Sequence, residues 1–222
     1  MIINKDTDLF GSFSKKAGNK GCILFNNAFS FYNMNAIYKS FSVDDIMWAT
    51  QAALVLGMKG FAVSKPYKTD VLLYVSDYSD EVAHIGAANT VVNKEGKLKA
   101  YNTDYIAAKE ALTALQPPLS DSPKKPLYIL GNGGYSKAVQ YAATLLGLEY
   151  TIIKRDNWED IAEIQGSIIY NCTPVERMVV SHSNDFIDCS VHSVSGNKLG
   201  KIQASKQFEL YTGRPAPETI FK

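Results

Sequence analysis

The feature that most constrains the fold is a glycine-rich segment in the second half of the chain. Leu127–Leu130 is a short apolar run typical of a buried strand, and Gly131-Asn132-Gly133-Gly134 follows it directly. A helical pattern then extends to Leu146. A strand, a glycine turn and a helix in this order present backbone N–H groups and a helix N-terminus to a pyrophosphate. The segment therefore predicts an α/β nucleotide-binding fold.

Two further predicted strands belong to the same layer. Tyr150–Ile153 ends in Lys154-Arg155-Asp156, where a dinucleotide fold meets the adenosine ribose. The two basic residues favour the phosphate of NADP, the acidic residue leaves NAD possible, and the alternative is a solvated charged turn. Ser167–Tyr170 leads into Asn171-Cys172-Thr173-Pro174, a loop that we place at the same sheet edge.

Composition narrows the class of protein. A chain of 222 residues is long enough for one large domain or two small ones, and a formal net charge of +1 gives no reason to expect a nucleic-acid or membrane partner. We find no signal-peptide pattern and no apolar run of bilayer length. The cysteines, Cys22, Cys172 and Cys189, are widely separated and the three histidines are scattered, so we expect no metal site, reduced thiols and a cytoplasmic location.

Strand and helix patterns alternate in the first half. Apolar spacing predicts helices at Gly21–Phe29, at Ser42–Gly57 with Ser42 as N-cap, and from Tyr67 to Val75. Strands are predicted at Asp8–Ser14, Ala36–Phe41 and Gly60–Ser64. This order indicates an α/β layer.

A hairpin is predicted around Glu95-Gly96, flanked by Thr90–Asn93 and Lys97–Tyr101. It places Asn89-Thr90 beside Asn102-Thr103-Asp104, so that amide, hydroxyl and carboxylate groups face one small polar ligand. The alternative is that these are ordinary strand-end and turn residues.

Three other side chains are candidates for the same ligand site. Ser12 and Ser14 alternate around Phe13, so both hydroxyls point to one side of a strand and can donate to a carboxylate. Lys68 follows the carboxyl end of a strand, where α/β sheets hold ligands, and near a carboxylate such as Asp104 it can exchange a proton with a hydroxyl. The alternatives are a solvated serine-rich turn and a surface lysine.

The domain boundary is predicted in Gln116–Pro126, a proline-rich linker after a helix at Tyr105–Leu115. A last helix is predicted at Gln203–Gly213, with Gln203 opening it and able to bond a ligand. Gln203 is otherwise a plain surface glutamine.

The order of seven motifs resembles the shikimate dehydrogenases over almost the whole chain. The motifs are Ser-x-Ser, Val-Ser-x-Pro-Tyr-Lys, Gly-Ala-x-Asn-Thr, Tyr-Asn-Thr-Asp, Leu-Gly-x-Gly-Gly, Asn-x-Thr-Pro and Gln-Ala-x-x-x-Phe-Glu-Leu-Tyr-Thr-Gly. The long spacer between Ser14 and Phe25-Asn26-Asn27-Ala28-Phe29 is similar to the shikimate dehydrogenase-like branch.

The resemblance implies a substrate domain at 1–116, with 203–222 packing back on it, and a Rossmann-type NADP domain at 117–202. It implies reversible reduction of 3-dehydroshikimate to shikimate by NADPH in aromatic amino acid biosynthesis, with a monomer or homodimer as the assembly. The implied catalytic residues are Lys68 and Asp104; the implied substrate ligands are Ser12 and Ser14 for the carboxylate, Asn89 and Gln203 for ring hydroxyls, and Thr103 as a neighbour. The implied cofactor residues are Gly131, Asn132, Gly133, Gly134, Lys154, Arg155, Asn171 and Thr173.

The chain also departs from the family. It is short, and the missing length lies in the second domain, so we expect a somewhat truncated Rossmann domain with a weaker nucleotide site. Lys65 stands where the family usually has an apolar residue. Two alternatives stay open: a dehydrogenase acting on quinate or another cyclic polyol acid, and a ligand-binding or regulatory homologue with weak cofactor binding.

Overall fold

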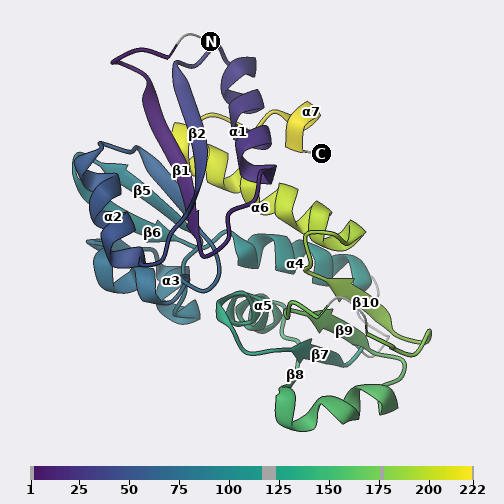
Figure 1. Cartoon of the computed structure of the whole chain (residues 1–222). Coiled ribbons are helices and arrows are strands. Elements are labelled where there is room, and N and C mark those ends of the chain that lie inside the picture. The colour runs from purple at the N-terminus through teal and green to yellow at the C-terminus, as the bar shows by residue number, and fades with distance from the viewer. Residues whose placement is uncertain (1–2, 117–123, 176–177, 222) are drawn as a thin grey trace. The chain divides into compact units, whose positions relative to one another are not determined.

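The computed structural model describes residues 3–116, 124–175 and 178–221, which form two compact units (Figure 1). The first unit holds residues 1–103 and 201–222, and the second holds residues 104–200. Most of the linker predicted at Gln116–Pro126 lies outside the described residues.

The first unit is built on a mixed sheet with the strand order β2-β1-β3-β5-β6-β4. Its strands are β1 (Asp8–Ser14), β2 (Ala36–Ser42), β3 (Gly60–Val63), β4 (Asp77–Tyr78), β5 (Thr90–Lys94) and β6 (Lys97–Tyr101). Its helices are α1 (Lys20–Phe31), α2 (Ile46–Val55), the 3₁₀ helix η1 (Asp70–Tyr74), α3 (Asp80–Ile85), α7 (Glu218–Phe221) and the part of α6 (Val194–Thr212) that begins at Lys201. The expected α/β class is confirmed.

Each face of this sheet carries its own hydrophobic core because side chains alternate along the strands. On one face Phe10 packs with aromatic residues of α1 and α6, including Phe29 and Tyr211, whose rings lie 5.1 and 5.4 Å from that of Phe10. On the other face Phe13 packs against Phe61 at 4.9 Å. Ser12 and Ser14 therefore share the face of Phe10 at the carboxyl end of β1.

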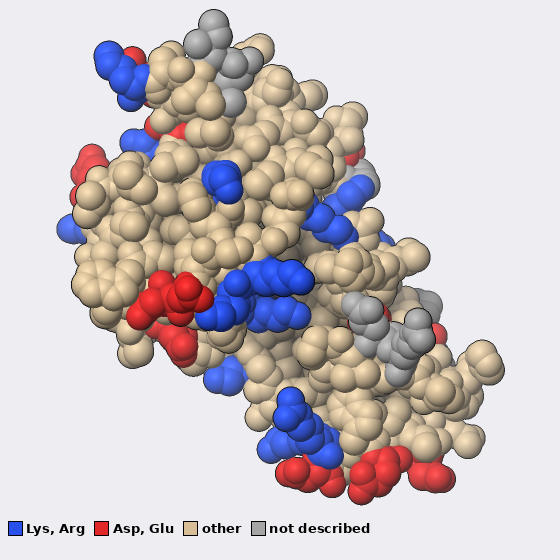
Figure 2. All heavy atoms as spheres, in the orientation of Figure 1, with Lys and Arg blue, Asp and Glu red and all other residues tan. Residues whose placement is uncertain are grey.

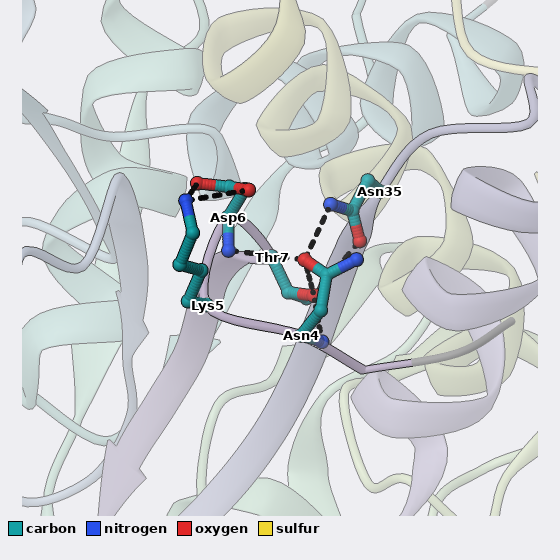
Figure 3. Close-up of polar contacts among 5 residues, drawn as sticks. All are labelled: Asn4, Lys5, Asp6, Thr7 and Asn35. Atoms are coloured by element: carbon teal, nitrogen blue, oxygen red, sulfur yellow. Dashed lines mark hydrogen bonds and ion pairs between the residues drawn. The ribbon is translucent and has the colours of Figure 1, made fainter.

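The start of the chain fixes the register of β1 against β2 (Figure 3). The hydroxyl of Thr7, just before β1, donates to Asn35, just before β2, at 2.8 Å. The Asn4 side-chain oxygen accepts from the amide of Asn35 at 3.2 Å and from the backbone N–H of Asp6 at 3.0 Å. In the resulting parallel register Ser12 lies opposite Ser40.

The second unit contains a parallel sheet with the order β10-β9-β7-β8. Its elements are α4 (Asp104–Leu115), β7 (Leu127–Leu130), α5 (Gly134–Leu145), β8 (Tyr150–Ile153), the 3₁₀ segment η2 (Arg155–Glu163), β9 (Ile168–Asn171) and β10 (Asp185–Asp188). The chain moves outward from β7 to β8 and then returns to the other side of β7 as β9. The carboxyl ends of β7 and β9 thus form a topological switch point, where sheets of this kind bind ligands.

Three predicted boundaries were wrong. Ser42 is the last residue of β2, and Asp45 caps α2 by accepting the backbone N–H of Met47 at 2.7 Å. The helix predicted from Tyr67 to Val75 is reduced to η1. Gln203 lies inside α6 rather than opening it, because Ser193 caps the helix by accepting the N–H of Gly196 at 2.9 Å. Among the described helices, none has the length and apolarity needed to cross a bilayer.

Candidate functional site

The predicted hairpin is confirmed and aligns its polar ends. β5 and β6 pair antiparallel from Thr90↔Tyr101 to Lys94↔Lys97. Glu95 and Gly96 close the turn with φ of 53° and 83°, the two left-handed positions of a tight hairpin. The strand ends preceding Thr90 and following Tyr101 therefore lie next to each other.

The side chain of Asn89 joins these two strand ends through hydrogen bonds, and we call the group of Asn89, Thr103 and Gln203 the polar junction. Its buried side-chain oxygen accepts the backbone N–H of Thr103 and the hydroxyl of Thr90, both at 2.8 Å. Its amide nitrogen donates to the Thr103 hydroxyl at 2.9 Å and to the side-chain oxygen of Gln203 at 2.8 Å. Asn89, Thr103 and Gln203, which the sequence placed in one site, are thus brought together by direct hydrogen bonds.

Helix α6 joins the hairpin through two glutamines one turn apart. Gln207 donates from its side-chain nitrogen to the Asn89 carbonyl at 3.1 Å and to the Thr90 hydroxyl at 3.0 Å. The side-chain oxygen of Gln203 accepts a hydrogen bond from Asn89. The NH₂ group of Gln203 therefore points away from Asn89, in a direction from which it can donate to a ligand. Gln207 was missed in the sequence, although its spacing of four from Gln203 on a helix was the signal.

The backbone of Lys68 and the backbone of Asp104 each lie next to a residue of this junction. The Lys68 carbonyl accepts the backbone N–H of Ala88 at 2.7 Å, which brings its backbone to the residue next to Asn89. Asp104 follows Thr103 directly, is completely buried and begins α4.

Ser12 belongs to a hydroxyl cluster that the sequence did not predict. Its hydroxyl donates a hydrogen bond to that of Ser40 at 3.0 Å. The Ser40 hydroxyl also accepts a hydrogen bond from the Cys22 thiol at 3.2 Å. Burial raises the pKa of Tyr38 far above the ordinary tyrosine range, and a hydrogen bond with Ser12 moderates the rise. Ser14 lies two residues along the same face and is largely buried. The side of β1 on which both serines lie is therefore lined with hydroxyl groups.

The glycine turn after β7 has the expected strand and helix on its two sides. Gly131 adopts φ of 93°, and a Cβ there would lie 2.8 Å from the Thr173 methyl group, so both backbone and space require glycine. Gly133 is the extended N-cap of α5, and a Cβ on it would meet nothing within 4 Å. The turn leaves open space in front of the helix N-terminus, which suits a phosphate group.

The loop after β9 is held by Asn171. Its amide nitrogen donates to Asp188 and to the Val175 carbonyl, both at 3.0 Å, and its oxygen accepts the N–H of Thr173 at 2.9 Å and the Thr173 hydroxyl at 2.7 Å. This buried side chain shapes the loop, and Thr173 is the residue that contacts the glycine turn.

Lys154 and Arg155 follow β8 and are exposed. The backbone N–H of Lys154 donates to Asn157 at 2.8 Å, which opens η2. Gly131 donates its N–H to the Ile153 carbonyl at 2.8 Å, so this basic pair follows a strand end that contacts the glycine turn. Figure 2 shows basic side chains next to a row of acidic ones at the end of the second unit where Figure 1 draws η2.

Comparison with known proteins identifies the class. The family profile described as shikimate dehydrogenase substrate binding domain matches residues 19–91. A shikimate dehydrogenase-like protein of Haemophilus influenzae is 30% identical over 271 aligned residues, covering 99% of this chain and 96% of the relative. A solved structure of a shikimate 5-dehydrogenase-like protein superposes with a TM-score of 0.80 at 25% identity, covering 99% of this chain and 97% of the other.

The chain belongs to the shikimate dehydrogenase family. It is also 34% identical to the NADP(+) shikimate dehydrogenase of Caldanaerobacter subterraneus over 69% of its own length and 55% of that enzyme. The Haemophilus alignment spans 271 positions against the 222 residues of this chain, so that relative contains residues with no counterpart here.

Proposed function

We propose that this protein is an NADP-dependent oxidoreductase that interconverts 3-dehydroshikimate and shikimate. The observation that carries the proposal is the hydrogen-bonded junction of Asn89, Thr103 and Gln203 in a chain of this family. Curated relatives over most of this chain are NADP(+) shikimate dehydrogenases, which supports both the substrate and the cofactor.

Recognition of the substrate divides between two groups of side chains in the first unit. When the ligand is bound, the Ser12 proton turns from Ser40 to the carboxylate, and Ser14, on the same face of β1, donates to the same group. The NH₂ group of Gln203, oriented by Asn89, donates to a ring hydroxyl, and Thr103 lies beside it. Neutral donors suit this ligand because they bind an anion and a polyol without adding a buried charge.

The nucleotide residues of the second unit fit a dinucleotide. The turn at Gly133 and Gly134, which is open at Gly133, binds the pyrophosphate at the N-terminus of α5, with Asn132 in the turn, and Lys154 and Arg155 bind the adenosine phosphate. Thr173 packs against the turn at Gly131, and Asn171 holds Thr173 in place through two hydrogen bonds. NADP, when bound, supplies or accepts the hydride, and NAD is the alternative cofactor.

Lys68 and Asp104 handle the proton in this proposal. As the substrate carbon loses hydride, the amine of Lys68 takes the hydroxyl proton, and it returns the proton in the reverse direction. Asp104 balances the positive charge that forms on Lys68. Such positioned proton transfer contributes about 10²–10⁴-fold to a rate.

Replacing Lys68 tests the assignment. We expect Lys68→Ala to lower kcat for shikimate oxidation by roughly 10²–10⁴-fold while shikimate affinity stays within a few fold, because the lost group acts on the proton rather than on binding. Steady-state kinetics and titration calorimetry measure the two quantities. Lys94 is an exposed lysine next to the hairpin turn, so Lys94→Ala is the matched control and should leave kcat and shikimate affinity unchanged. Turnover in Lys68→Ala equal to that of the parent would remove Lys68 from the mechanism.

A substrate panel tests the function itself. Nicotinamide absorbance is followed with shikimate, quinate and related cyclic acids, each with NADP and with NAD. We expect the highest kcat/KM with shikimate and NADP. Faster oxidation of quinate would move the assignment to the alternative dehydrogenase, and shikimate binding with no binding of either nucleotide would favour a ligand-binding protein.

A further inference from the structure

Two cysteines that are far apart in sequence occupy neighbouring positions at one edge of the second unit's sheet. β9 and β10 are adjacent parallel strands whose register ends at Asp188↔Asn171 (Figure 1). Cys172 and Cys189 are the next residues of the two strands, and the Cys189 N–H donates to the Asn171 carbonyl at 3.1 Å, which continues the ladder. Neighbouring strands lie about 4.8 Å apart, within the roughly 4.4–6.8 Å between Cα atoms that a disulfide spans.

The strand register, continued by one residue, places both side chains on the same face of the sheet. Cys172 is two residues beyond Tyr170 and Cys189 is two beyond Ile187, and Tyr170 and Ile187 are register partners. The Tyr170 hydroxyl lies 3.0 Å from that of Tyr135. Burial raises the pKa of both phenols well above 10.0, and both Cys172 and Cys189 add to the rise in each. Both sulfurs therefore lie close enough to this pair of phenols to affect it.

The residues preceding the two cysteines are tied together. The Asn171 amide donates to the Asp188 carboxylate at 3.0 Å across the two strands, and Asp188 also accepts the N–H of Ser190 at 2.9 Å. The first bond ties the two strand ends together directly before the cysteines, and the second fixes the turn of the chain around Cys189. Both cysteine residues are partly exposed, so the site is not enclosed in the core.

We propose that Cys172 and Cys189 form a reversible dithiol–disulfide site that reacts with small disulfides of the glutathione class. The thiolate of one cysteine attacks a sulfur of the small disulfide, breaks its S–S bond and releases one thiolate. The thiolate of the second cysteine then attacks the protein sulfur of the mixed disulfide, forms the Cys172–Cys189 bond and releases the second thiolate. The protein loses two protons and two electrons, and the small disulfide is reduced to two thiols.

The new bond would join the Asn171–Pro174 loop to the end of β10. The backbone of Cys172 lies 3.9 Å from the position of a Cβ on Gly131, so the site borders the glycine turn. The assignment stands on strand register and does not depend on the substrate or cofactor proposed above.

The test is oxidation of the full chain by glutathione disulfide, followed by alkylation, intact mass measurement and digestion without reductant. We expect the parent protein to lose two hydrogen atoms without retaining glutathione, to yield a linked pair of peptides containing Cys172 and Cys189, and to revert with dithiothreitol. Cys22→Ser, which removes the third thiol, should give the same product.

Single-cysteine variants provide the complementary result. Cys172→Ser and Cys189→Ser lack the second thiol and should stop at a mixed disulfide with one glutathione on the remaining cysteine of the pair. The digest of the parent protein decides the question even where a variant fails to fold. Separate glutathione adducts on Cys172 and Cys189, no reaction at either, or a link from either one to Cys22 would overturn the proposal.

Discussion

At the scale of single residues, Ser40 is predicted to position Ser12 for the carboxylate. The Ser12 and Ser40 hydroxyls lie 3.0 Å apart, so Ser40→Ala removes one of the hydrogen-bond partners that hold the Ser12 side chain in place. A hydrogen bond contributes about 0.5–1.5 kcal/mol net, and we therefore expect shikimate to bind roughly 2–12-fold more weakly in Ser40→Ala. Titration calorimetry measures this affinity, and kcat should change little.

Ser40→Thr is the conservative control because it keeps the hydroxyl and suits a strand. It should restore most of the affinity lost in Ser40→Ala. Unchanged binding of shikimate in Ser40→Ala would show that the cluster has no part in holding the ligand.

The polar junction is the part of the candidate site that the sequence predicted well. Hairpin geometry required that Asn89 and Thr103 meet, since turn and strand patterns set the register within a short stretch. The contribution of Gln207, and the contact of Ser40 with Ser12, depend on how distant segments pack. Helix spacing marks Gln207 as a neighbour of Gln203, but local patterns carry no information on pairing between distant segments, so both contacts could be found only in the structure.

At the scale of elements, long periodic segments were predictable and weakly patterned ones were not. The predicted strands and helices around β1, α1, β7 and α5 are confirmed because apolar periodicity marked them, and a glycine turn also marked β7 and α5. The first half of α6, which contains Gly196 and Gly200, was not predicted as part of the helix. A helical glycine costs only about 1 kcal/mol, and the core contacts of Phe208 and Tyr211 hold the helix further along.

The packing of α6 against the sheet gives a prediction at this scale. A Cβ on Gly60 in β3 would lie 2.6 Å from the Tyr211 ring of α6 and 3.0 Å from the Val91 carbonyl. Because backbone cannot yield easily, we expect Gly60→Ala to lower the free energy of unfolding by about 1–3 kcal/mol. Urea denaturation measures the change.

Gly200→Ala is the matched control on α6. A Cβ there meets nothing within 4 Å, so the helical alanine should raise stability by about 0.5–1 kcal/mol. A loss of stability in both variants would mean that the clash with Tyr211 is not the cause.

At the scale of the whole molecule, buried tyrosines predict a loss of stability in alkali. Burial raises the pKa of Tyr38, Tyr135, Tyr170 and Tyr211 above the ordinary 10.0. Above that pH the unfolded chain releases phenolic protons that the folded protein retains, so the unfolded state binds fewer protons and ΔG of unfolding falls as pH rises. The stability from these groups is fully present below pH 10 and is lost as pH approaches the folded values. The limiting slope is about 1.4 kcal/mol per pH unit for each tyrosine.

Urea midpoints from about pH 8 to about pH 11, with tyrosinate absorbance recorded in parallel, check this dependence. Tyr211→Phe isolates one group: within the described part of the chain its buried hydroxyl has no hydrogen-bond partner, so removing it relieves a desolvation cost of about 1–3 kcal/mol. We expect Tyr211→Phe to be more stable near neutral pH and to show a shallower alkaline decline, by the share of one tyrosine. If all 13 tyrosines of the folded protein ionise near pH 10 without unfolding, the buried phenols do not control the alkaline limit.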